Sequence, residues 1–223
     1  MEYPLAPTHA RIREIWQMTT TRSGVAPGKV QKGTILAFAS LNNLSRNLSV
    51  NLQSNDDQKI TPLQMLLPNM RIAEMFALGL GICRVPVKDG VELFGNAEFS
   101  SDPYDTMFTA VEQVALRHLF LATLAFKTNT TDRFDALHTS EFLIKSVSTS
   151  DKTIKPVMLP ASYTMVGGEP NVLSLAMPSS GDLLPLNDSA ARKLYLCFNS
   201  QVMIVVPPSE SQKQSIAAQM RGE

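Results

Sequence analysis

Residues 103–127 form the stretch that most constrains what this chain can fold into. Asp102 can cap a helix that begins at Pro103, because a proline in the first turn loses no backbone hydrogen bond. Apolar side chains then recur so densely, up to Phe126, that little polar surface remains. A helix that is apolar nearly all round is covered by other elements or by another subunit. The sequence predicts a central buried helix here, with Leu119 and Leu121 both inside it.

Two β-hairpins are predicted, one on each side of this stretch. The first places an Asp89-Gly90 turn between short apolar runs at 84–87 and 91–94. The second places the polar residues 199–201 between two apolar runs near the end of the chain.

Further helices and strands complete the predicted fold. A helix is predicted over 68–78, since a proline fits its first turn and Gly79 and Gly81 fit its end. Strand is predicted within 34–53, and a last short helix over 209–220. With helices grouped in mid-chain and strands on both sides, the sequence predicts an α+β fold. Its parts are a central apolar helix, short antiparallel strands and hairpins, and a flexible N-terminal arm.

The N-terminal segment is predicted to stand apart from the rest of the chain. Residues 19–34 contain several glycines and a proline, with basic residues and no acid, which is typical of a flexible connector. A short amphipathic helix around Trp16 precedes it. We therefore expect residues 1–33 to be a flexible basic arm with a short helix, and residues 34–223 to be one compact α+β body.

The ends of the chain and its cysteines bear on where it resides. The N-terminus has no basic segment followed by an apolar run, so we expect no secretory signal peptide. No window reaches 18 uncharged apolar residues, so we expect no membrane span. Cys83 and Cys197 lie among apolar residues and are predicted to be buried free thiols. The interpretation is a cytoplasmic protein, in the host cytoplasm or the virion if the chain is viral.

The residues that could carry chemistry form no motif. Three histidines occur, and none stands at metal-ligand spacing from a cysteine or another histidine. The glycine pairs lack the context of a phosphate-binding loop. We therefore expect no cofactor, and the sequence favours a non-enzymatic role. The alternative is an enzyme with a non-local site around His118, His138 and Cys83.

Charge is segregated along the chain although its total is balanced. Residues 1–54 carry six basic side chains against two acids, whereas residues 89–112 carry six acids and no Lys or Arg. The candidate contact residues of the arm, for a neighbouring subunit or a polyanion, are Arg11, Arg13, Trp16, Arg22, Lys29 and Lys32. The candidate acidic partner surface is Asp89, Glu92, Glu98, Asp102 and Asp105. Opposed charges on one chain suit contacts between copies of it.

These observations favour a structural protein that associates with itself, of the kind that builds a viral capsid, nucleocapsid or matrix layer. The expected partner is a second copy of the chain. Nucleic acid is a weaker candidate, because the basic residues of the arm are too sparse to neutralise many phosphates. Besides the enzyme, an intracellular adaptor domain that binds a peptide or protein remains an alternative.

Overall fold

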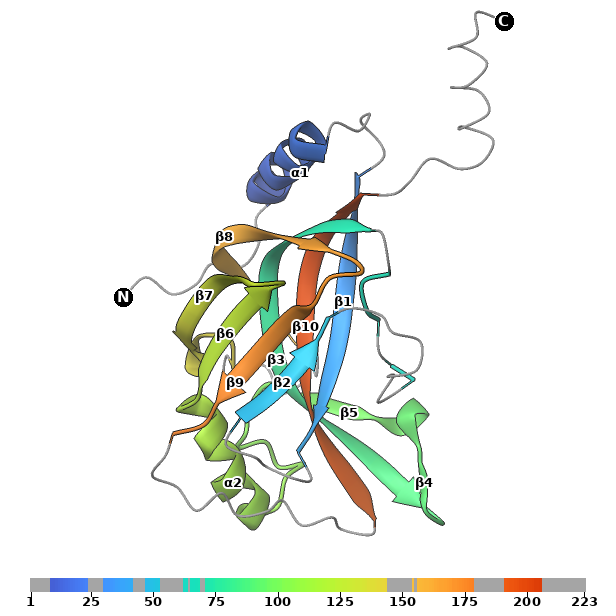
Figure 1. The fold of residues 1–223 in the computed structure, drawn as a ribbon. Coiled ribbons are helices and arrows are strands. Elements are labelled where there is room, and N and C mark those ends of the chain that lie inside the picture. The colour runs from blue at the N-terminus through green and yellow to red at the C-terminus, as the bar shows by residue number, and fades with distance from the viewer. Residues whose placement is uncertain are drawn as a thin grey trace, which may run out of the picture.

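The structure is a computed structural model, and it describes residues 9–23, 30–41, 47–52, 62–63, 65–68, 71–143, 154, 156–178 and 191–205. These residues contain two α-helices and ten β-strands. The strands form two antiparallel sheets (Figure 1). The predicted α+β fold around a central helix is therefore wrong, because sheet dominates the architecture.

The first sheet is built on two long neighbouring strands, β3 (Ile72–Lys88) and β10 (Arg192–Val205). On the far side of β10 lies β1 (Val30–Ser40). Along the other edge of β3 follow, one after another, β8 (Val157–Val166), β5 (Glu98–Ser100) and β4 (Val91–Glu92). The second sheet has the order β2 (Asn47–Asn51), β9 (Asn171–Ala176), β6 (Thr123–Thr128) and β7 (Thr131–His138).

Eight of these strands pair in a nested order. The first strand, β1, pairs with the last, β10, and β2 pairs with β9. Further in, β3 pairs with β8, and β6 pairs with β7. With the short β4 and β5 set aside, the chain is one long hairpin wrapped into two facing sheets. This is the topology of an eight-stranded jelly roll.

The main hydrophobic core fills the space between the two sheets. Both sheets contribute alternate side chains to it, as expected for strands with one face turned inward. The first sheet supplies Ile35, Leu78, Leu80, Ile82 and Phe198, and the second supplies Leu48, Val50, Leu124, Phe126, Leu173 and Leu175. The second α-helix adds Leu116 and Leu119.

The strand β3 runs through the region where a helix over 68–78 was predicted. Every residue from Ala73 to Cys83 is buried, because the sheet is covered on both faces. A strand covered on both faces loses its alternation and reads as a continuous apolar run. Gly79 and Gly81 are not a helix end. A Cβ on Gly81 would lie 2.4 Å from the Ile154 side chain, so these glycines admit a segment that crosses the sheet closely.

The helix predicted over 103–127 is much shorter in the structure. Helix α2 spans Ala110–Phe120, and Thr109 caps it through a capping box with Glu112. Residues 102–108 form turns instead of a first helical turn, since the backbone N–H of Asp105 donates to Asp102 at 3.0 Å. Beyond the helix, the apolar run continues as strand β6. The density of apolar residues therefore came from two elements of different type.

The two predicted hairpins have different outcomes. The first is confirmed: β3 and β4 pair across the Asp89-Gly90 turn, where Asp89 has φ 52° and Gly90 has φ 77°. The second is wrong, because β10 continues unbroken through Asn199 and Ser200. The polar residues sit at a change of register after Gln201, a β-bulge rather than a turn. The helix predicted over 209–220 lies outside the described residues.

The outer face of the first sheet is covered at two places. At one, helix α1 (His9–Ser23) lies across the end of the sheet, where its buried Ile15 joins Val30, Phe76 and Met203 (Figure 1). At the other, a second cluster gathers Phe38, Cys83, Val85, Tyr195 and Cys197. The division of the chain at residue 33 stays a prediction, and the sheet itself begins at Val30.

Candidate functional site

The three residues of the alternative enzyme site lie in different parts of the fold. Cys83 is buried in β3, in the cluster on the outer face of the first sheet. His118 is half-buried on α2, and His138 is exposed at the end of β7. Within the described chain no hydrogen bond joins any two of them. Burial raises the pKa of Cys83 to about 12. A thiol of such high pKa is a poor nucleophile near neutral pH.

Both cysteines are free and buried, which confirms the prediction of buried thiols. Burial, together with the neighbouring Cys83, also raises the pKa of Cys197. The two side chains act as small apolar groups that pack against Phe38 and Tyr195.

Three acids of the band at 89–112 are neutralised within the chain, two of them by residues of β10. Lys193 Nζ lies 2.8 Å from Glu92 Oε1, and Arg192 Nη2 lies 2.8 Å from Glu112 Oε1. The third, Glu98, pairs with Arg84 of β3. The basic partners lie on strands β3 and β10, which the fold brings next to these acids. The band at 89–112 therefore carries less unpaired negative charge than its sequence suggests.

Glu92 is held from two sides. In addition to the lysine, Tyr195 Oη donates a hydrogen bond to Glu92 Oε2 at 2.7 Å. Partial burial raises the pKa of Glu92, but hydrogen bonds from Lys193 and Tyr195 and the charge of Lys193 outweigh it, and the net pKa lies below the usual value. This carboxylate therefore ties β4 to β10.

Asp89, Asp102 and Asp105 form no ion pair with any residue that the structure describes. Asp89 is exposed in the β3–β4 turn. Asp102 Oδ1 accepts the backbone N–H of Tyr104 at 2.9 Å, and Asp105 Oδ2 accepts the Ser100 hydroxyl at 2.9 Å. The bonds of Asp102 and Asp105 fix the turns before α2, and among the described residues no cation lies beside any of the three carboxylates.

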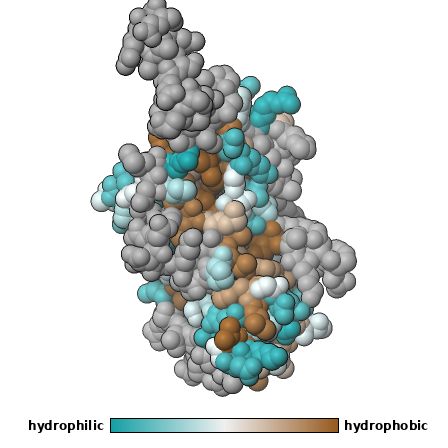
Figure 2. Space-filling model, turned by 90° about the vertical axis from the view of Figure 1, so that its right-hand side faces the viewer, coloured by the Kyte–Doolittle hydropathy of each residue, from teal (hydrophilic) through white to brown (hydrophobic). Residues whose placement is uncertain are grey.

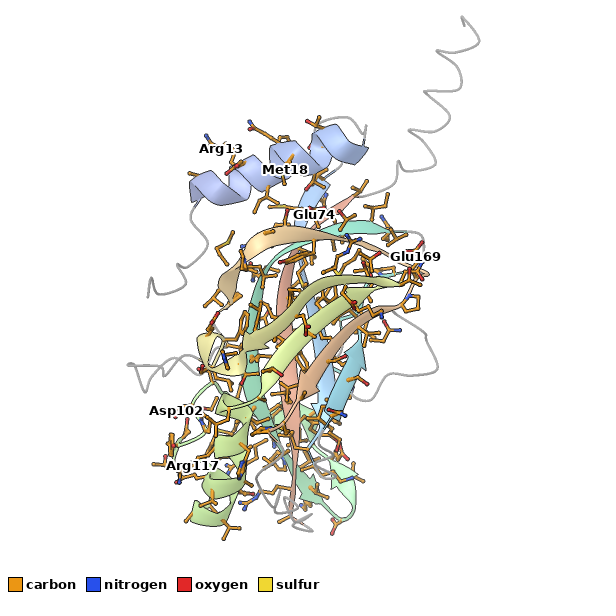
Figure 3. All side chains as sticks on the ribbon, turned by 60° about the vertical axis from the view of Figure 1, so that its left-hand side comes forward. Arg13, Met18, Glu74, Asp102, Arg117 and Glu169 are labelled. Carbon is orange, nitrogen blue, oxygen red and sulfur yellow. The ribbon has the colours of Figure 1, made fainter. Side chains whose placement is uncertain are left out.

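The candidate residues of the arm are described only in part. Arg13 is exposed, and Figure 3 shows it on the side of α1 that points away from the sheets. Lys32 is exposed on β1. Trp16 Nε1 donates to the carbonyl oxygen of Val30 at 3.0 Å, so this side chain is occupied within the chain. Lys29 and the side chains of Arg11 and Arg22 lie outside the described residues.

A buried carboxylate lies on the outer face of the first sheet. Glu74 of β3 is 2% exposed and accepts hydrogen bonds from Ser162 and Thr164 of β8, both at 2.8 Å. Hydroxyl donors on the next strand compensate part of the cost of burying the carboxylate. We assign Glu74 a role in joining the two strands.

Sequence reasoning missed a row of exposed apolar side chains along α2 (Ala110–Phe120) and its C-cap residue Leu121. Val111 is 64% exposed, Val114 47% and Leu121 65%, and the half-buried His118 lies between them in the row. The spacing of three, four and three residues puts all four on one helix face. That spacing is visible in the sequence, but these residues were assigned to the buried surface of the longer helix.

Other apolar residues are also exposed away from α2. Val91 in β4 is 61% exposed and Met65, which pairs with Leu36 of β1, is 55% exposed. Figure 2 shows the side of the molecule on the right of Figure 1, where hydrophobic residues gather in a band with hydrophilic residues on both sides. The fold is thus a double-sheet jelly roll that leaves large apolar side chains outside its core.

Comparison with known proteins finds no match: no family model, no curated protein and no solved structure matches this chain. Among the residues that the structure describes, no three His, Cys, Asp or Glu side chains are grouped to hold a metal ion. Neither of the two described helices is long and apolar enough to cross a membrane.

Proposed function

We propose that this chain is a non-enzymatic structural protein that associates with copies of itself into a capsid-like or matrix-like layer. The jelly roll is an architecture of viral capsid proteins, and also of lectins and cupins. A fold of this kind hosts several functions, so the surface has to decide among them.

The observation that carries the proposal is the row of large apolar side chains along α2, which lies outside an already closed core. Scattered exposed apolar residues are ordinary, whereas residues aligned on one element mark a contact surface. On α2, Val111, Val114 and Leu121 are aligned in this way and are each about half exposed or more. Such a surface favours a protein partner.

Copies are expected to meet through side chains rather than by joining sheet edges. The edge strand β7 presents the exposed charges Asp132, Arg133 and Asp135. Ala136 has φ 55°, which distorts the strand near its end. Charges and irregularities on an edge strand oppose pairing with another chain.

Charge supplies a second contribution to association. Exposed Arg13 on α1, and the other basic residues of the arm, can meet Asp89, Asp102 and Asp105 of another copy. Charges in contact with solvent act over about 10 Å at 0.1 M salt and about 3 Å at 1 M. Nucleic acid would compete for the same basic residues, and it enters the proposal only as an additional partner.

Sedimentation velocity of the full chain at rising concentration tests this proposal. We expect large species to form at high concentration, to a greater extent at low salt. Arg13→Ser should weaken association at low salt and have little effect at high salt. A protein that stays monomeric at the highest concentration and lowest salt, with and without a single-stranded oligonucleotide, would overturn the proposal and favour the enzyme or adaptor alternatives.

A further inference from the structure

Helix α2 carries an unpartnered apolar row with a symmetric spacing. The positions 111, 114 and 118 of α2, together with its C-cap at 121, follow the a and d positions of a heptad, the pattern of a helix that packs along a second helix. The opposite face of α2 is occupied, since Ala115, Leu116 and Leu119 are buried in the main core. The row is therefore available on the outside of a helix that the core holds in place.

We infer that α2 packs against α2 of a second copy, antiparallel and around a twofold axis. The inference rests on the proposed function and names the surface through which two copies meet. A twofold contact uses the same patch on both copies. The row is symmetric about its middle, so an antiparallel pair sets Val111 against the partner's Leu121 and Val114 against the partner's His118.

Charges beside the row complement each other in the same arrangement. Arg117 is exposed and forms no ion pair with the described residues. Gln113 Nε2 donates to the carbonyl oxygen of Asp105 at 3.1 Å, so the Asp105 turn lies beside the first half of α2. Figure 3 shows Asp102 and Arg117 on the same side of the molecule, beside α2.

In an antiparallel pair, the second half of each helix lies beside the first half of the other. Arg117 of each copy then faces the turn that holds the partner's Asp102 and the partner's Asp105. Within the described chain, neither carboxylate has a cation beside it, and Arg117 has no carboxylate beside it.

The size of the row indicates a weak contact. Four side chains cover much less than the about 800 Å² per partner that a stable pair of proteins buries. The α2 pair is therefore one of several contacts that together hold an assembly, and repetition makes weak contacts effective. An isolated pair forms only at high protein concentration.

Cysteine trapping tests the geometry of the pair directly. In the double variant Val111→Cys with Leu121→Cys, the two new thiols of one helix lie about 15 Å apart and cannot join each other, because a disulfide needs Cα atoms within about 7 Å. Across an antiparallel pair, the thiol introduced at position 111 of one copy faces the thiol introduced at position 121 of the other copy. Mild oxidation of the concentrated protein should give a covalent dimer, visible on a non-reducing gel.

The single variants provide the control for direction. Val111→Cys alone and Leu121→Cys alone should remain monomeric, because like positions lie about 15 Å apart in an antiparallel pair. The native thiols are buried and should not contribute. The inference would be overturned if either single variant gave as much covalent dimer as the double variant, or if the double variant gave no dimer.

Substitutions in the row separate this inference from the proposed function. Val114→Glu should raise the concentration needed for association at least tenfold, whereas Val91→Glu, at a similarly exposed valine of β4, should not. His118→Leu completes the apolar row and should tighten association on the order of tenfold. If Val114→Glu assembles like the wild type, the α2 contact is wrong while self-association stands. If the wild type itself never associates, the proposed function fails.

Discussion

Two leucines at the end of α2 give the sharpest test of the fold. Leu119 is 1% exposed in the main core, and Leu121 is 65% exposed at the C-terminal end of the helix. A long buried helix would bury both alike. The structure instead predicts that truncating them to alanine has very different effects on the free energy of unfolding.

The magnitudes follow from burial. Leu119→Ala removes a side chain packed between α2 and the sheets, and such truncations cost about 2–5 kcal/mol. Leu121→Ala removes a side chain that is mostly in water, where substitutions change stability by about 0.5 kcal/mol or less. Total stabilities of proteins are about 5–15 kcal/mol, so the first change is a large fraction and the second is small.

Urea unfolding at low protein concentration, followed by circular dichroism, measures both changes. Low concentration keeps association from adding to the stability of either variant. The expected result is a large fall in the unfolding midpoint for Leu119→Ala and almost none for Leu121→Ala. Equal losses, or a larger loss for Leu121→Ala, would refute the assignment of α2 and support a longer buried helix.

Three further predictions concern the sheets. Gly167→Ala should destabilise the fold strongly, because its Cβ would lie 1.9 Å from the backbone oxygen of Pro68, whereas Gly95→Ala, with nothing within 4 Å, should be tolerated; thermal melts compare the two. The Cys83 thiol, with its pKa raised to about 12, should not react with a thiol reagent at pH 8 until the protein is unfolded. The pKa of Glu92 is lowered in the folded state, so its contribution to stability is present above the unfolded pKa and is lost as the pH falls through the folded value. Glu92→Gln should therefore flatten the loss of stability between about pH 5 and pH 3, measured by urea unfolding at each pH.

The short-range features of the fold could be predicted from the sequence. The Asp89-Gly90 hairpin was found because a two-residue turn with positive φ has a local signature. The buried state of Cys83 and Cys197 followed from their apolar neighbours. Each of these predictions depends only on residues within a few positions of each other.

The long-range pairing could not be predicted in the same way. The strand β1 pairs with β10, which lies more than 150 residues later, and no local pattern records such a partner. The first part of β3, within 68–78, was predicted to be a helix because coverage on both faces erased the alternation of a strand. The apolar runs of α2 and β6 were joined into one helix because only Leu121 and Ala122 separate them.

The charged surfaces show a similar limit. Segregation of charge was visible in the sequence, but the partners of Glu92, Glu98 and Glu112 come from other strands. The apolar row on α2 could have been found from the spacing of Val111, Val114 and Leu121. The row was missed because the predicted helix was too long and apolar nearly all round, so all of its apolar residues were expected in the core.

Electron microscopy of the concentrated full chain tests the central claim most directly, because it distinguishes an ordered assembly from aggregation. A jelly-roll protein that builds a capsid-like or matrix-like layer should form uniform closed particles or a regular two-dimensional array, and Val114→Glu should form neither under the same conditions. A field that contains only single molecules or amorphous aggregates, at every salt concentration tried, would contradict the account.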